Sequence, residues 1–266
     1  MADQWQNFLG NLGTWRGSFS ALGLDGQEQK STPSILSLIA DPAEARLVHF
    51  RLRRFADLAC SGEPVSDLQQ DYRSLGRQVV FFETGTFCKG SLQVAPGSSF
   101  GAEFGFIHGD RRHRLVQLHN EEGRLDKLVL IREFREGSDA REEPSLTPSA
   151  LSGSWSGTAS TISADWPEPD LATCQFNIDV SEGGALTMAE SFSRATPAAE
   201  GPDVRVTWMA DGGYHRTPEG LSHREPFRIE AGWLVGEDRL ERLIRCYDRT
   251  GAWLSAIQII ATRART

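Results

Sequence analysis

The 266-residue sequence predicts an all-β protein made of two antiparallel β-barrels in tandem, which arose by internal duplication. Three observations lead to this prediction. Short segments rich in β-branched, aromatic and leucine residues are separated by Gly, Asn, Asp or Pro. Some of these segments alternate apolar and polar residues with a period of two, which is typical of strands. A series of motifs in the first half also recurs, in the same order, in the second half.

The duplication is visible in glycines and aromatic residues that recur at a nearly constant spacing. Gly13-Thr14-Trp15-Arg16-Gly17 returns as Gly153-Ser154-Trp155-Ser156-Gly157, which is 140 residues later. Further pairs follow at spacings of 127 and 128 residues: Gly105-Phe106-Ile107 with Gly232-Trp233-Leu234, Arg114-Leu115-Val116 with Arg242-Leu243-Ile244, and Arg135 with Arg263. Because the order never changes, chance similarity does not explain the series.

The repeat predicts barrel 1 at residues 1–138, a linker at 139–150 and barrel 2 at 151–266. Near the start, Asp3 to Leu9 can form a short helix that places Trp5 and Phe8 on one side, and we expect it to plug one end of barrel 1. Roughly eight strands per copy favour closed barrels, because closure removes the unpaired sheet edges. A barrel of this size can hold a small ligand.

Composition excludes several classes of protein. The net charge is −8 and there is no basic tract, so we expect no binding to nucleic acid or to anionic membrane surfaces. No apolar run approaches the roughly 20 residues of a membrane-spanning helix. The four cysteines form no C-x-x-C pair and no secretory signal is recognisable, which predicts reduced thiols and a cytoplasmic location. The six histidines show no zinc-site spacing, so no metal site is expected.

The repeated G-[ST]-W-x-G motif has a structural interpretation. Glycine permits close backbone approach at the closed end of a barrel, and the tryptophan fills that end. The motif resembles the G-x-W signature of lipocalins, the calycin superfamily. In lipocalins an arginine of the last strand covers this tryptophan. The resemblance therefore implies that Arg135 covers Trp15 and that Arg263 covers Trp155, each contact contributing roughly 0.5–2 kcal/mol.

A closer resemblance covers most of residues 5–135. Asn11 to Phe19, Phe81-Phe82, Gly85-Thr86-Phe87 and Arg114 to Gln117 are similar to an uncharacterised family found mainly in cyanobacteria, which has a calycin-type fold. By fold this family stands near the S-type phycobilin lyases, which transfer a linear tetrapyrrole to an antenna protein. The resemblance implies a bilin or another tetrapyrrole as ligand and an antenna protein as partner. The opening motif is also similar to nitrobindin-like haem barrels, but the predicted final strands contain no histidine to ligate haem.

Strand alternation suggests which polar side chains face a cavity. In the segment 114–119 one face carries Gln117 and His119, and the corresponding face in the second copy carries Arg245 and Tyr247. We expect these residues and Glu133 to bind the ligand. The hydrogen-bond donors among them would bind carboxylates of the ligand, and Glu133 would lie beside a protonated pyrrole. The alternative is that this face is an ordinary solvated surface.

No residue pattern identifies a catalytic group, so enzymatic activity is left open. The favoured function is binding of a hydrophobic small molecule, most simply a tetrapyrrole, by a carrier or a chromophore-lyase-like protein. One alternative is an isomerase-like enzyme that acts on a fatty acid or an isoprenoid; another is a structural protein whose barrels are filled. Barrel 1 is the expected ligand site, because Trp233 stands in the second copy where Phe106 stands in the first, and the larger tryptophan ring takes up cavity volume.

Overall fold

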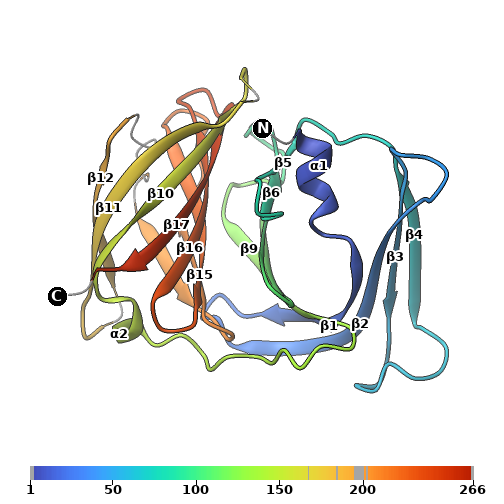
Figure 1. Ribbon diagram of the computed structural model, residues 1–266. Coiled ribbons are helices and arrows are strands. Elements are labelled where there is room, and N and C mark those ends of the chain that lie inside the picture. Colours follow the sequence, from blue (N-terminus) through green and yellow to red (C-terminus); the bar gives the residue numbers. More distant parts are fainter. Residues whose placement is uncertain (1–2, 167, 184, 195–200, 202, 265–266) are drawn as a thin grey trace.

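Two curled antiparallel sheets stand side by side and account for nearly the whole chain (Figure 1). This computed structural model describes residues 3–166, 168–183, 185–194, 201 and 203–264. The helices within these ranges are short: α1 (Gln4–Leu9) and α2 (Pro148–Leu151). The all-β prediction and the tandem arrangement of two barrel-like units are confirmed.

The first sheet has nine strands in the hydrogen-bonded order β4-β3-β2-β1-β9-β8-β7-β6-β5. Their bounds are β1 (Gly13–Leu22), β2 (Glu28–Ala40), β3 (Val48–Arg54), β4 (Ser66–Tyr72), β5 (Val79–Phe81), β6 (Phe87–Gly90), β7 (Phe100–His108), β8 (Arg111–His119) and β9 (Leu125–Arg135). A segment from Arg135 to Thr147 then runs below both sheets to α2 (Figure 1).

Over the described residues, the second sheet has eight strands in the order β12-β11-β10-β17-β16-β15-β14-β13. Their bounds are β10 (Gly153–Ser163), β11 (Asp170–Val180), β12 (Leu186–Phe192), β13 (Val204–Trp208), β14 (Gly213–Pro218), β15 (Phe227–Val235), β16 (Arg239–Tyr247) and β17 (Trp253–Arg263). In both sheets the first strand pairs with the last, as in a meander that curls back on itself.

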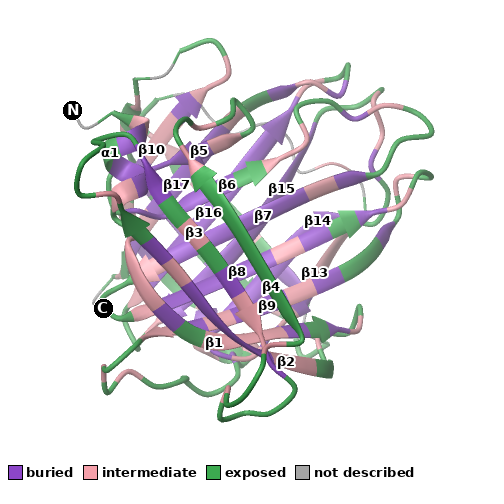
Figure 2. Cartoon of the chain, turned by 90° about the vertical axis from the view of Figure 1, so that its right-hand side faces the viewer, coloured by how far each residue is buried: buried purple, intermediate pink, exposed green. Residues whose placement is uncertain are grey.

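Each sheet is a half-barrel rather than a closed barrel, which corrects the expectation of closure. Within the described residues, β4 does not pair with β5, and β12 does not pair with β13. β4 is exposed along most of its length (Figure 2), as suits an edge strand. Helix α1 lies at the open seam instead (Figure 1). The Gln4 amide exchanges two hydrogen bonds with the backbone of Phe81, so the helix satisfies part of the β5 edge.

Both half-barrels have the same tryptophan–arginine arrangement at one end. Trp15 and Trp155 are buried, and the guanidinium of Arg135 or Arg263 lies 4.3 Å from the corresponding ring centroid. Each indole N–H donates to a backbone carbonyl four residues earlier. Gly13 stands at a φ of 126°, which L side chains rarely adopt, and a Cβ there would lie 2.5 Å from the Arg135 guanidinium.

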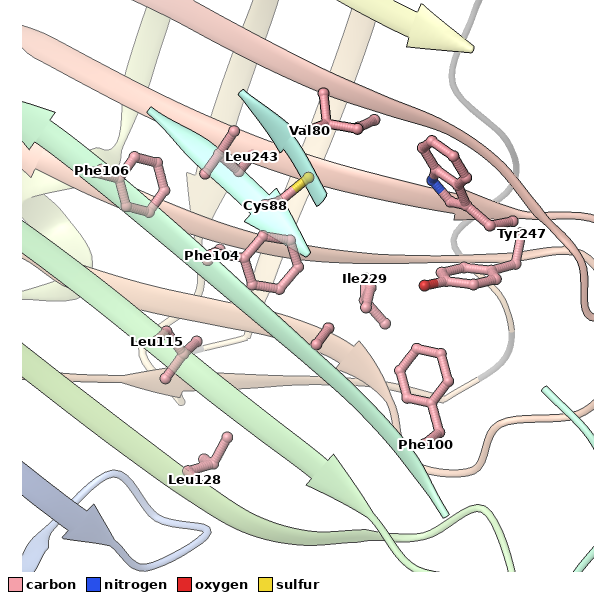
Figure 3. Close-up of a cluster of buried hydrophobic side chains, with 14 of the residues drawn as sticks. Val80, Cys88, Phe100, Phe104, Phe106, Leu115, Leu128, Ile229, Leu243 and Tyr247 are labelled. Carbon is pink, nitrogen blue, oxygen red and sulfur yellow. The ribbon is translucent and has the colours of Figure 1, made fainter. Parts of the chain in front are cut away.

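The largest hydrophobic cluster joins the two half-barrels. It contains one face of β7 and β8 from the first sheet and the equivalent face of β15 and β16 from the second (Figure 3). The phenyl rings of Phe100 and Phe227 pack at 6.2 Å between centroids, and Phe106 lies 6.1 Å from Trp233. The sheets therefore share an apolar core, and each keeps its other face for its own concave interior.

Candidate functional site

Four of the five proposed ligand residues lie at the interface between the half-barrels. Gln117 contacts His215 of the second sheet, and the hydroxyl of Tyr247 donates to the Ser91 carbonyl at 3.0 Å. Arg245 reaches the Gly90 carbonyl at 3.4 Å, and His119 packs against the ring of Phe100. The expectation that this face lines a barrel interior is therefore wrong. All four side chains are buried by the other sheet.

Strand register explains the error. Residues that pair across an antiparallel ladder share a face of the sheet. In the ladder between β8 and β9, the backbone of Gln117 lies opposite Leu128. Arg114 lies opposite Ile131, and Arg112 lies opposite Glu133. Hence Gln117 and Glu133 stand on opposite faces. The aromatic face of β7 likewise turns toward the second sheet.

The interior of the first half-barrel holds a cavity of about 430 Å³. Most of its wall is apolar and comes from α1 and from strands β1, β2, β3, β5, β6, β8 and β9: Phe8, Phe19, Leu36, Leu38, Phe50, Leu52, Val79, Phe81, Phe87, Val116 and Ile131. Near the open seam the wall is polar and includes Gln70, Tyr72 and Gln78. An adjoining hollow of about 520 Å³ shares Gln78 and Lys89 with the cavity and continues it toward Leu118.

A chain of charged side chains, buried except for the half-exposed Lys89, forms part of the cavity wall. Arg112 Nε donates to Glu133 at 2.7 Å, and Arg114 donates to both oxygens of Glu133 at 3.0 Å. Arg114 also donates to Glu103 at 2.7 Å, and the ammonium of Lys89 lies 2.8 Å from the same carboxylate. Glu133, placed near a cavity by sequence reasoning, is thus held between two guanidinium groups.

The arginines control the ionisation of these carboxyls. Burial alone would raise the pKa of Glu133, but the charges of Arg112 and Arg114 outweigh burial and hold its pKa below the ordinary value. The pKa of Glu103 is lowered in the same way, against burial, by Arg114 and Lys89. Both groups are therefore carboxylates at neutral pH.

Arg112 differs from Arg114 because one of the donor atoms of its buried guanidinium has no hydrogen-bond partner among the described residues. Only 3% of the side chain is exposed, and its Nη2 atom is buried without a hydrogen-bond partner among the described residues. Burial and the adjacent charge of Arg114 lower the pKa of Arg112, although Glu133 acts in the opposite direction. The guanidinium also lies 4.7 Å from the Trp15 ring centroid, which holds its plane in place.

The second half-barrel is filled by its own side chains. Among the described residues, a hollow beside Val204, Arg216, Arg228 and Glu230 measures only about 10 Å³. The hydroxyl of Tyr214 donates to Glu230 at 2.7 Å, and Arg242 bridges Glu230 and Glu190. Phe176 pairs with Trp155, where the first half has Leu36 beside Trp15.

The two interiors also differ in one charged pair. Arg112 and Glu133 face each other between β8 and β9, and the register places Leu240 and Ala261 at the equivalent positions between β16 and β17. Sequence reasoning missed Arg112 and Arg114. Their spacing of two residues puts them on one strand face, and this signal could have identified them.

A groove of about 570 Å³ lies between α1 and the second sheet, bordered by Thr158, Ser160 and Gln258. It is larger than the cavity, but the amide of Gln258 is already bonded to Thr84, and no side-chain polar atom of the groove's described residues is buried without a partner. We therefore consider the cavity the better candidate. Over the described ranges, no group of three or more His, Cys, Asp or Glu side chains could hold a metal ion.

The fold and its interiors define a protein of two β-half-barrels, one hollow and one filled. A family model described as "Domain of unknown function (DUF3598), N-terminal" matches residues 1–138. A second model, "Biogenesis factor required for ATP synthase 1, C-terminal domain", matches residues 142–264. A DUF3598 protein of unknown function from Nostoc punctiforme has a crystal structure similar over 99% of this chain and 100% of its own, with 34% identity and a TM-score of 0.87. The chain belongs to the DUF3598 family.

Two other solved structures are far more distant. A putative outer membrane protein from Bacteroides fragilis is 10% identical, with a TM-score of 0.24 over 98% of this chain and 100% of that one. Kievitone hydratase from Nectria haematococca is 10% identical, with a TM-score of 0.23 over 97% and 90% of the two chains. These scores are too low to support an argument. No curated protein is significantly similar in sequence. Both helices of the described chain are too short to cross a membrane.

Proposed function

We propose that the first half-barrel binds a small molecule with a large apolar body, and that the protein acts as a carrier or as a chromophore-lyase-like protein. A linear tetrapyrrole is the ligand class that the sequence resemblance favours, with an antenna protein as the recipient. The binding site is the cavity, and Glu133 contributes by fixing Arg112 rather than by contacting a pyrrole.

The contrast between the two interiors supports this proposal most strongly. Protein interiors pack densely and contain few voids larger than a water molecule. The second half-barrel, a meander with one strand fewer, packs its interior around Phe176, Ile178 and Ile259, so a curled sheet of this kind does not require a cavity. The first interior leaves about 430 Å³ open, which is within the roughly 300–1,000 Å³ of small-molecule sites.

The chemistry of the cavity favours binding over catalysis. Aromatic and aliphatic side chains suit an extended apolar molecule, and the open seam beside Tyr72 gives it a path inward. An isomerase-like enzyme needs an acid or base whose pKa is near the working pH. The buried carboxyls Glu103 and Glu133 instead have lowered pKa values and are occupied by arginines.

Titration calorimetry on the full chain tests this proposal, with biliverdin and dodecanoic acid as separate probes. We expect one molecule to bind per chain. Leu36→Phe introduces the residue type found beside Trp155, and we expect it to weaken binding at least tenfold by filling the cavity. Phe176→Leu, the reverse change in the second half, is the matched control and should leave affinity unchanged. Absence of binding by both probes, or equal effects of the two variants, contradicts the proposal.

A second candidate function rests on the C-terminal match alone. The model covering residues 142–264 is named for a biogenesis factor required for ATP synthase 1, which favours an assembly role for the filled half-barrel. Size-exclusion chromatography of the chain mixed with purified ATP-synthase subunits tests it. Co-elution at a defined ratio is the expected result, and separate elution at micromolar concentration rejects this role.

A further inference from the structure

We infer that the ligand of the first half-barrel carries a carboxylate and that this group binds the guanidinium of Arg112; the inference rests on the proposed binding function. It narrows the ligand to an amphipathic carboxylate, a class that includes fatty acids and the propionates of a linear tetrapyrrole.

The charge balance at the cavity wall is the first reason. Arg112 and Arg114 balance the two carboxylates Glu103 and Glu133, and the ammonium of Lys89, which is about half exposed, brings the net charge of the cluster to +1. Buried charges are stable when they are paired and hydrogen-bonded. One anionic group of a ligand would therefore neutralise this cluster.

A buried donor without a partner is the second reason. Arg112 lines the cavity, and its Nη2 has no hydrogen-bond partner among the described residues, although buried donors are nearly always paired. Glu133 occupies Nε, and the stacked indole of Trp15 fixes the guanidinium plane. A donor held in this way binds a carboxylate without losing much side-chain freedom.

The second half-barrel supplies the third reason. It reaches the same fold with Leu240 and Ala261 at the positions of Arg112 and Glu133. Apolar residues often replace a buried ion pair without loss of stability. Since folding does not require the pair, a ligand-binding role accounts for its presence beside a cavity.

The test compares each acid with its ester on the intact chain, by titration calorimetry. The probe pairs are dodecanoic acid with methyl dodecanoate, and biliverdin with its dimethyl ester. We expect the unmodified chain to bind at least one acid tenfold or more tightly than the matching ester. Whether the fatty acid or the tetrapyrrole shows this preference identifies the source of the carboxylate.

The double variant Arg112→Leu/Glu133→Ala introduces the pair of the second half-barrel. We expect it to bind the acid no more tightly than the ester. Arg132→Leu is the matched control: it removes an arginine of β9 that pairs with Glu28 and Glu142 on the other face, and acid affinity should stay within twofold. Equal affinity for acid and ester in the unmodified chain overturns the carboxylate inference and leaves the binding function standing. Failure of every probe to bind overturns both.

Discussion

Removing Glu133 alone should destabilise the protein far more than removing it together with Arg112. Glu133 is 1% exposed and accepts hydrogen bonds of 2.7, 3.0 and 3.0 Å from two arginines. In Glu133→Ala, Arg114 keeps its bond to Glu103 at 2.7 Å, whereas Arg112 loses the one carboxylate that it pairs with among the described residues. An uncompensated buried charge costs roughly 3–5 kcal/mol.

The double variant Arg112→Leu/Glu133→Ala removes the stranded charge as well. It copies the pair Leu240 and Ala261, which the second half-barrel packs at the same register position. We therefore expect its unfolding free energy to lie within about 1.5 kcal/mol of the unmodified chain. The single variant should melt roughly 6–20 °C lower, at about 2–4 °C per kcal/mol for a chain of this size.

Urea unfolding followed by tryptophan fluorescence, together with thermal melts, measures both variants under the same conditions. The important quantity is the difference between the single and the double variant. If Glu133→Ala is as stable as the double variant, Arg112 does not depend on Glu133 for its compensation. The buried charge cluster described above would then have no energetic significance.

Three further results are expected. His119 and His215 are buried in the interface, and burial lowers their pKa values to about 4 and about 3. Both imidazoles stay neutral in the folded protein, but in the unfolded chain they take up protons below about pH 6.5. The free energy of unfolding should therefore fall as the pH falls from 6.5 toward 4, by about 3 kcal/mol for His119 alone. His119→Phe should flatten that dependence, and a pH-independent unfolding midpoint would contradict the assignment. Trp15→Ala should lower the free energy of unfolding in urea by roughly 3–5 kcal/mol, since the ring is fully buried. A loss below 1 kcal/mol would show that this end of the half-barrel does not depend on the ring. Gly105→Ala places a Cβ 2.2 Å from the Phe87 ring and should lower the free energy of unfolding by roughly 1–3 kcal/mol. Adding Phe87→Leu should restore part of this loss. An unchanged unfolding midpoint in Gly105→Ala would mean that the ring does not need this close approach.

The sequence was most informative where a signal was repeated. The tryptophan and glycine motif occurs twice, and the colinear series around it separates two equivalent β units. The structure places Arg135 over Trp15 and Arg263 over Trp155, each in the geometry that the lipocalin resemblance implies. These features depend on local residue order, which a single sequence contains in full.

The sequence could not assign the faces of β8 and β16. Alternation distinguishes inside from outside only where one face meets water. Most of both strands is buried on both faces, one against the other half-barrel and the other against the strand's own interior. Register decides which residues share a face, and register depends on partners in β9 and β17. Barrel closure failed for a similar reason, since α1 rather than a strand lies beside β5.

The most direct test of the account is a crystal structure of the full chain with 12-bromododecanoic acid, in which anomalous scattering locates the bromine. We expect one bromine site per chain, inside the first half-barrel toward the seam at Tyr72, with the carboxylate within hydrogen-bond distance of the Arg112 guanidinium. We expect no site in the interior of the second half-barrel. Bromine only in the groove beside α1, or in the second interior, would contradict the central claim that the first half-barrel is the ligand site.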